Sequence, residues 1–296
     1  RPTGGSPRRR ATWAKRRAGR LPGGLGVVAV LACTIFAALT GSAPATVAAI
    51  GSIMIAPMVE HGYDKKTAVG LCAAAGALGP IIPPSITMIV FGVTMSVSIP
   101  AMFLGGIVPG LLIALLLIAA NMFHAFRHPE ILKHRRTEKM QWGVFFRTTL
   151  TTLPTLLLPV IILGGIYNGR FTPTESAAVG VAYALLLGFC YRELRIKDIP
   201  KLLVRSAETS AMVCFIISVA NILSWIMAST QASNAIVNSL MTFVNNKFSF
   251  LLVMNLFLIL VGALLDQGAA VIIICPMLFN LGTSLGIEPL HLALNM

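Results

Sequence analysis

Two short clusters of helix-breaking residues interrupt apolar stretches in the first third of the chain. The first is Thr40, Gly41 and Ser42, followed by Pro44, and the second is residues 79–84, which carry three prolines. A proline removes a backbone donor and clashes with the preceding turn, so an α-helix cannot continue through residues 79–84. Unpaired carbonyl oxygens and the hydroxyls of Thr40 and Ser42 together could surround a cation with neutral oxygens.

The apolar pieces beside these clusters are short for membrane spans. Residues 25–39 and 45–58 flank the first cluster, and residues 67–77 and 85–97 flank the second. A helix needs about 20 apolar residues to cross the bilayer core, and unpaired backbone at that depth must be buried in protein or line a cavity. We therefore predict a re-entrant hairpin around the first cluster and an unwound helix at the second. Kinks that serve only packing are the alternative.

Asp266 is the acidic residue deep in a later apolar stretch. Residues 250–281 are predicted to form a second interrupted hairpin, with Gly262 at its small-residue break. An ionisable group inside a membrane is expensive and marks a functional site by default, whereas the alternative is a helix cap at a hairpin tip in water. Thr172 and Glu175 have the spacing of a capping box, so Glu175 is assigned a structural role.

The composition indicates that most of the chain lies in lipid. Of 296 residues, 56% are hydrophobic and 11% are charged, and the mean hydropathy is +0.83, whereas soluble domains carry about a quarter charged residues. The net charge of +13 gathers in residues 1–20, 123–139 and 191–205. That distribution is typical of cytoplasmic loops, so no nucleic acid partner is expected. The cysteines lie in or beside apolar runs and are expected to be buried thiols.

We predict an all-α polytopic membrane protein with two inverted re-entrant hairpins and broken transmembrane helices. Its expected segments are a basic cytoplasmic leader (1–20), a first hairpin with a proline-broken repeat (21–122), connecting spans with two basic cytoplasmic loops (123–205), and a second, incomplete repeat (206–296). Each hairpin runs from a small-residue break through an Ile-rich helix to a Pro-Met pair, Pro57-Met58 or Pro276-Met277. Inverted repeats of this kind hold a site near the membrane midplane.

At these residues the sequence resembles the large membrane subunit of the tripartite ATP-independent periplasmic (TRAP) transporters. The resemblance covers nearly everything after Arg20 and is most specific at residues 79–85 and 171–175. Further matching segments are residues 41–42, 45–46, 48–51, 62–64, 165–170 and 262–266. The resemblance implies an elevator of two inverted hairpin repeats that moves an organic anion together with Na⁺ as coupling ion, without a cofactor.

The resemblance also implies roles for individual residues. One Na⁺ site is expected to comprise Thr40, Gly41, Ser42, Gly79, Ile82 and Pro83, with Gly262 contributing to a second Na⁺ site. Thr46, Ser85 and Asp266 are the expected contacts of the anion. The expected partners are a small membrane subunit, a periplasmic solute-binding protein that delivers the anion, and the lipid of the bacterial cytoplasmic (inner) membrane. The expected solute is a C4-dicarboxylate, a sialic acid or another carboxylate.

An ion gradient is the expected energy source, because the Gly-x-x-x-x-Gly-Lys-Ser/Thr motif of ATPases does not occur. Three features depart from the family pattern: a basic leader replaces apolar spans before Leu21, Pro44 stands where a small residue is usual, and a second proline-rich break is expected beyond Met296. An inert truncated or structural membrane subunit is therefore the main alternative. An intramembrane enzyme using Asp266 or Ser42 lacks a paired carboxylate or a base.

Overall fold

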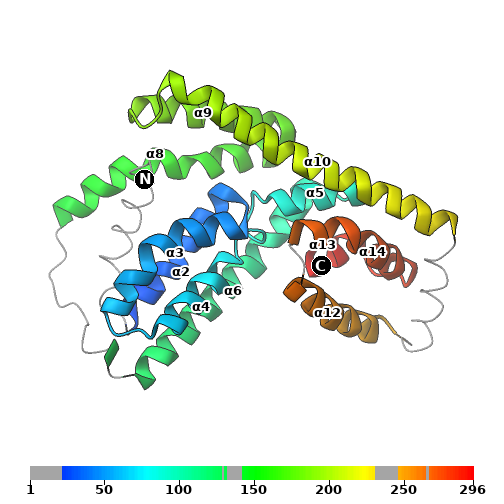
Figure 1. Ribbon diagram of the computed structural model, residues 1–296, viewed down its shortest axis with the longest axis horizontal. Helices are drawn as coiled ribbons and strands as arrows, with labels where there is room; N and C mark the ends of the chain where they lie inside the picture. Colours follow the sequence, from blue (N-terminus) through cyan, green and yellow to red (C-terminus); the bar gives the residue numbers. More distant parts are fainter. Residues whose placement is uncertain (1–21, 129, 132–141, 231–245, 265–266) are drawn as a thin grey trace. The chain divides into compact units, whose positions relative to one another are not determined.

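The computed structural model describes residues 22–128, 130–131, 142–230, 246–264 and 267–296 (Figure 1). Within these ranges all regular elements are helices. Five helical segments there are long and apolar enough to cross a membrane, namely Ala43–Glu60, Ile99–Arg127, Pro173–Cys190, Ile196–Val219 and Lys247–Leu264. The prediction of an all-α chain with several membrane-length helices is confirmed.

The helices follow one another with short connections. They are α2 (Gly24–Thr40), α3 (Ala43–Glu60), α4 (Lys65–Gly76), α5 (Ile86–Met95), α6 (Ile99–Arg127), α8 (Trp142–Tyr167), α9 (Pro173–Cys190), the 3₁₀ turn η1 (Ile196–Asp198), α10 (Ile199–Ser229), α12 (Lys247–Leu264), α13 (Gln267–Ile273), α14 (Cys275–Ser284) and α15 (Pro289–Asn295).

The chain divides into two compact units. The first contains the described residues up to Ile86 and Phe103–Arg195, and the second contains Thr87–Met102 and Ile196–Met296. Both units are therefore built from two stretches of sequence. These units follow spatial contacts rather than repeats, so the predicted divisions after residues 122 and 205 remain predictions.

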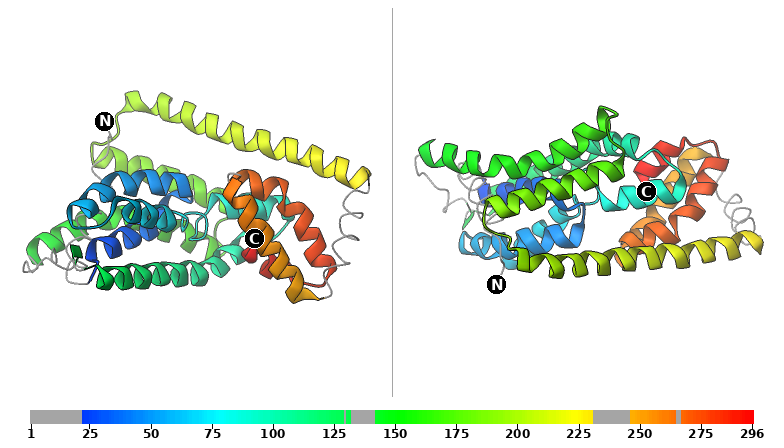
Figure 2. Two further views of the ribbon diagram at one scale, coloured as in Figure 1. Left: turned by 60° about the horizontal axis from the view of Figure 1, so that its bottom comes forward. Right: turned by 90° about the horizontal axis from the view of Figure 1, so that it is seen from above.

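In the first unit, α2, α3 and α4 pack side by side around a core that α6 also joins (Figures 1 and 2). Fully buried Ile50, Met54 and Met58 of α3 fill this core. The neighbouring helices contribute many small side chains, such as Ala75 of α4 and Ala125 of α6. Small residues let membrane helices approach closely, which is how helices associate without a hydrophobic driving force.

Helices α8 and α9 form a second antiparallel pair in the first unit (Figure 1). The Thr172 hydroxyl accepts a hydrogen bond from the Glu175 N–H at 3.3 Å, and a Glu175 carboxylate oxygen accepts one from the Thr172 N–H at 2.8 Å. These reciprocal bonds are the predicted capping box, so the structural assignment of Glu175 is confirmed. Across the pair, the Tyr183 hydroxyl donates to the Pro154 carbonyl oxygen at 2.8 Å.

The second unit has its own core, formed by residues of α5, α12, α14 and α15. Phe91 and Phe279 meet edge to face there, with ring centroids 5.7 Å apart. Helix α10 is different, because its described side chains are exposed or half-buried along its length, as suits a lipid-facing helix. The expectation of five buried thiols is wrong for Cys190 and Cys214, which are exposed on α9 and α10.

The first hairpin differs in length from the prediction. Helix α3 has 18 residues and continues through Pro57, so it is longer than the piece expected at residues 45–58 and long enough to cross a membrane. In the second unit the corresponding Pro276 instead begins a new helix, α14. Re-entrant topology and the inverted repeat therefore remain predictions. The basic leader at residues 1–20, the tip residue Asp266 and most of the first basic loop lie outside the described residues.

Candidate cation site at two helix breaks

The first break consists of two residues, Gly41 and Ser42, between α2 and α3. Gly41 adopts a left-handed conformation with φ +59°, and its N–H donates to the Ala37 carbonyl oxygen at 2.8 Å. This is the usual way for a glycine to end a helix. Ser42 precedes α3 in an extended conformation, and Pro44 follows in the first turn of α3, where a proline is tolerated because helical donors there lack partners anyway.

The second break extends over residues 77–85, which form no α-helix. The N–H groups of Ile81 and Ile82 both donate to the Leu78 carbonyl oxygen, at 3.1 and 2.9 Å. By contrast, within the described part of the chain, no hydrogen bond reaches the carbonyl oxygens of residues 79–84. Their lone pairs are therefore open to another partner, as the proline spacing suggested.

The two breaks meet backbone against backbone. A Cβ atom on Gly79 would lie 2.6 Å from the Ser42 carbonyl carbon and 2.8 Å from the Ala43 nitrogen. A Cβ atom on Gly41 would lie 2.8 Å from the Pro84 carbonyl oxygen and 2.9 Å from the Ile86 nitrogen. A long hydrogen bond of 3.4 Å from the Ile86 N–H to the Gly41 carbonyl oxygen joins the breaks. Each glycine is needed because the opposite backbone occupies the space of a side chain.

A chain of four oxygen atoms runs through the first break. The Thr40 hydroxyl lies 3.1 Å from the Phe36 carbonyl oxygen and 2.9 Å from the Thr46 hydroxyl, which in turn lies 2.8 Å from the Ser42 carbonyl oxygen. Two hydroxyls supply two protons for these three contacts, since each threonine hydroxyl carries one. At any moment one contact lacks a proton, and two lone pairs face each other there. A cation beside the two hydroxyls would relieve that repulsion.

Most of the expected site residues are thus brought together. Thr40, Gly41, Ser42 and Gly79 lie at the junction of the breaks, and Thr46 and Ser85 at its edges are fully buried. Ile82 and Pro83 belong to the same second break, and Pro83 is buried. No residue in the ranges 40–46 and 77–86 is ionisable, so any charge at this junction would be that of a ligand.

Gly262 is not part of this junction. It lies near the end of α12 in the second unit, where a Cβ atom would have no neighbour within 4 Å among the described residues. Asp266, its expected companion, lies outside the described residues. The second expected Na⁺ site and the acidic contact of the anion therefore remain predictions.

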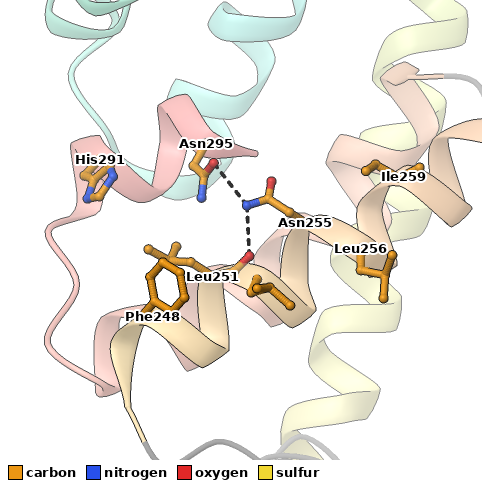
Figure 3. A pocket seen from close by; sticks show the side chains of 8 residues that line it. Phe248, Leu251, Asn255, Leu256, Ile259, His291 and Asn295 are labelled. Atoms are coloured by element: carbon orange, nitrogen blue, oxygen red, sulfur yellow. Dashed lines mark hydrogen bonds between the residues drawn. The ribbon is translucent and has the colours of Figure 1, made fainter.

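The second unit also has an open pocket of about 530 Å³ between α12 and α15 (Figure 3). Its wall is mostly apolar, with Phe248, Leu256 and Ile259 among the lining side chains. Asn255 lies at its centre and donates to the Leu251 carbonyl oxygen at 2.8 Å (Figure 3). None of the expected site residues lines this pocket, so it is separate from the junction of the breaks.

Sequence reasoning missed Asn121, a buried polar residue of α6, and its partner Tyr63. The signal was present, because an asparagine inside an apolar span needs a hydrogen-bonding partner in protein. The string Gly62-Tyr63-Asp64 had been noted only as a point of resemblance.

Membrane-length helices combined with paired, buried helix breaks define the class of secondary membrane transporters. The sequence profile of the family described as "Tripartite ATP-independent periplasmic transporter, DctM component" matches residues 3–296. The C4-dicarboxylate TRAP transporter large permease protein DctM of Pseudomonas aeruginosa is 40% identical over 295 residues, which are 99% of this chain and 68% of that protein.

Two further relatives carry other solute names. The isethionate TRAP transporter permease protein DctMQ of Oleidesulfovibrio alaskensis is 38% identical over 99% of this chain and 46% of its own length. The sialic acid TRAP transporter large permease protein SiaM of Vibrio cholerae is 32% identical over 94% of this chain and 65% of its own length. The chain belongs to the TRAP transporter family, as the large permease component. It is a multi-pass membrane transport protein and not an enzyme.

Proposed function

We propose that this chain is the permease subunit of a Na⁺-coupled importer of an organic anion in the bacterial inner membrane. One Na⁺ would bind at the junction of the two breaks, to oxygens of the group Thr40, Gly41, Ser42, Gly79, Ile82 and Pro83. Gly262 would contribute to a second Na⁺ site. Thr46, Ser85 and Asp266 are the proposed contacts of the anion.

The observation that supports this proposal is the direct contact of the two breaks. Gly79 abuts the Ser42–Ala43 peptide, and the adjoining carbonyl oxygens of residues 79–84 accept no hydrogen bond within the described part of the chain. Such backbone is costly at membrane depth unless something satisfies it. A row of neutral oxygens without an anionic group suits a monovalent cation, because broken-helix carbonyls and hydroxyls are the oxygens that transporters use for Na⁺.

The nature of the solute is proposed from the relatives. Their names specify C4-dicarboxylate, isethionate and sialic acid, all organic anions, and the first of these belongs to the relative at 40% identity. We propose a C4-dicarboxylate or a related carboxylate. A periplasmic solute-binding protein would deliver it, and a small membrane subunit would accompany the chain.

Uptake into proteoliposomes tests the proposal. The permease, with its small membrane subunit and its binding protein, is reconstituted, and entry of labelled succinate, isethionate and sialic acid is followed with an inward Na⁺ gradient or an equal K⁺ gradient. We expect uptake of one of these anions only with Na⁺. Uptake that is equal in both gradients would refute Na⁺ coupling. Absence of uptake with any anion and either gradient would favour the inert or structural alternative.

A further inference from the structure

A buried hydrogen-bond network lies outside the junction, at the opposite end of α2. Tyr63 and Asn121 are 3% and 4% exposed. The Tyr63 hydroxyl lies 2.9 Å from the Gly23 carbonyl oxygen and 3.0 Å from Asn121 Oδ1, and Asn121 Nδ2 donates to the same Gly23 oxygen at 3.0 Å. Three separate segments therefore meet here: the residue before α2, the turn between α3 and α4, and the second half of α6.

Glycines make this meeting possible. Gly23 has φ +69°, and a Cβ atom there would lie 2.8 Å from both the Tyr63 hydroxyl oxygen and Ala125 Cβ. At Gly26, one turn into α2, a Cβ atom would overlap the Asn121 side-chain amide. The first turn of α2 therefore packs with its bare backbone on Asn121. No side chain other than hydrogen fits either position without moving α2 away from α6.

The string Gly62-Tyr63-Asp64 serves the same contact. Gly62 has φ +88° and would clash with the Glu130 carbonyl oxygen, 2.9 Å away, if it carried a Cβ atom. Asp64 caps α4 by accepting a hydrogen bond from the Lys66 N–H at 3.1 Å. The turn is thus fixed on both sides of Tyr63. Burial raises the pKa of the Tyr63 phenol, which keeps it protonated and able to donate at physiological pH.

The network and the junction lie at opposite ends of the same helices. Helix α2 has 17 residues, starts next to Gly23 and ends at Thr40, while α3 starts at the junction and ends at the Tyr63 turn. At 1.5 Å per residue, α2 is about 25 Å long, so a tilt of about 2° about its base would move Thr40 by about 0.9 Å. Binding constellations tolerate displacements of about 0.5 Å.

We propose that Tyr63 and Asn121 are positioning residues for the cation site, because they fix the base of α2 and the α3–α4 turn to α6 and so hold the two breaks in register. This inference rests on the proposed function. The network does not touch the ion. It acts through the direction of α2, which carries Thr40 and Gly41 against the second break.

Tyr63→Phe is the first test, because it removes one hydroxyl and keeps the ring. Tyr183→Phe is a matched control, since the Tyr183 hydroxyl also donates to a backbone carbonyl oxygen, that of Pro154, but between α8 and α9. Both variants are prepared as the permease with its small subunit in nanodiscs and proteoliposomes. The Na⁺ concentration for half-maximal uptake, the maximal uptake rate, and amide hydrogen exchange in residues 36–46 and 77–86 are then measured.

For Tyr63→Phe we expect the half-maximal Na⁺ concentration to rise about fivefold to tenfold, a change in apparent binding of about one decade, with the maximal rate changed by less than about twofold. Amide exchange at the junction should be faster. Tyr183→Phe should leave the Na⁺ concentration and the exchange unchanged. Equal behaviour of the two variants would overturn the inference, because a general loss of stability would affect both alike.

Asn121→Ala is the second variant, and it leaves the Tyr63 bond to Gly23 in place. We expect a smaller shift in the same direction. If Tyr63→Phe does not fold and Asn121→Ala folds with wild-type Na⁺ dependence and exchange, the inference is wrong. If the wild type itself does not respond to Na⁺, the proposed function fails, and hydrogen exchange alone decides the inference: unchanged exchange at the junction in Tyr63→Phe overturns it.

Discussion

Substituting Gly79 by alanine probes the junction most directly. The added Cβ atom would lie 2.6 Å from the Ser42 carbonyl carbon and 2.7 Å from its oxygen, whereas ordinary van der Waals contact begins near 3.4 Å. These neighbours are backbone atoms and cannot rotate away. The two breaks must therefore separate by about 0.8 Å, which exceeds the displacement of about 0.5 Å that a binding site tolerates.

We expect this separation to raise the half-maximal Na⁺ concentration for uptake at least about tenfold, corresponding to about 1.4 kcal/mol of lost ion binding. Overpacking of this kind also destabilises a fold by about 1–3 kcal/mol, so the thermal unfolding of the purified variant is measured beside its uptake. The assay is anion entry into proteoliposomes across a series of Na⁺ concentrations, at equal protein content.

Gly70→Ala is the matched control within the same unit. Gly70 lies in α4, and a Cβ atom there would meet nothing within 4 Å among the described residues. Because alanine is favoured over glycine inside a helix by about 1 kcal/mol, this variant should be at least as stable as the wild type, with unchanged Na⁺ dependence. A folded Gly79→Ala protein with the Na⁺ dependence of Gly70→Ala would refute the assignment of the cation to the junction.

Three further substitutions test neighbouring parts of the argument. Thr40→Val removes one hydroxyl of the oxygen chain and should raise the half-maximal Na⁺ concentration about tenfold, whereas Thr34→Val, which removes a hydroxyl bonded 2.8 Å from the Val30 carbonyl oxygen in the same helix, should not. Gly26→Ala forces its Cβ atom into Asn121 and should lower stability by about 1–3 kcal/mol in thermal unfolding, and an unchanged midpoint would argue against the close packing of α2. Thr172→Ala removes a helix cap and should cost about 0.5–2 kcal/mol without altering Na⁺ dependence.

The helix breaks were predictable because local chemistry alone determines them. Three prolines within residues 80–84 exclude helical hydrogen bonding whatever surrounds them, and a glycine followed by a serine ends one helix and starts another. The capping box of α9 follows from two side chains three residues apart. In each of these cases the information lies within one helical turn of the sequence.

The long-range contacts were not predictable in the same way. Nothing near Gly41 in the sequence indicates that its partner is the backbone of residues 84–86, because a backbone surface has no side-chain signature. The length of α3 was underestimated because Pro57 and Pro44 suggested ends, whereas Pro57 is accommodated inside the helix. Burial of Cys190 and Cys214 was wrongly expected because apolar runs in a membrane protein can face lipid as well as protein.

The physical link between ion binding and movement lies in what the breaks leave unsatisfied. In the described part of the chain, one long hydrogen bond from the Ile86 N–H to the Gly41 carbonyl oxygen joins their backbones, while the carbonyl oxygens of residues 79–84 go without donors. A ligand shifts an equilibrium between two conformations only by its difference in affinity for them. A cage of neutral oxygens that is complete only when both breaks are in contact provides such a difference. In the proposed mechanism Na⁺ therefore stabilises the closed junction, and any residue that holds the breaks in register, as Tyr63 is proposed to do, contributes to ion affinity without touching the ion.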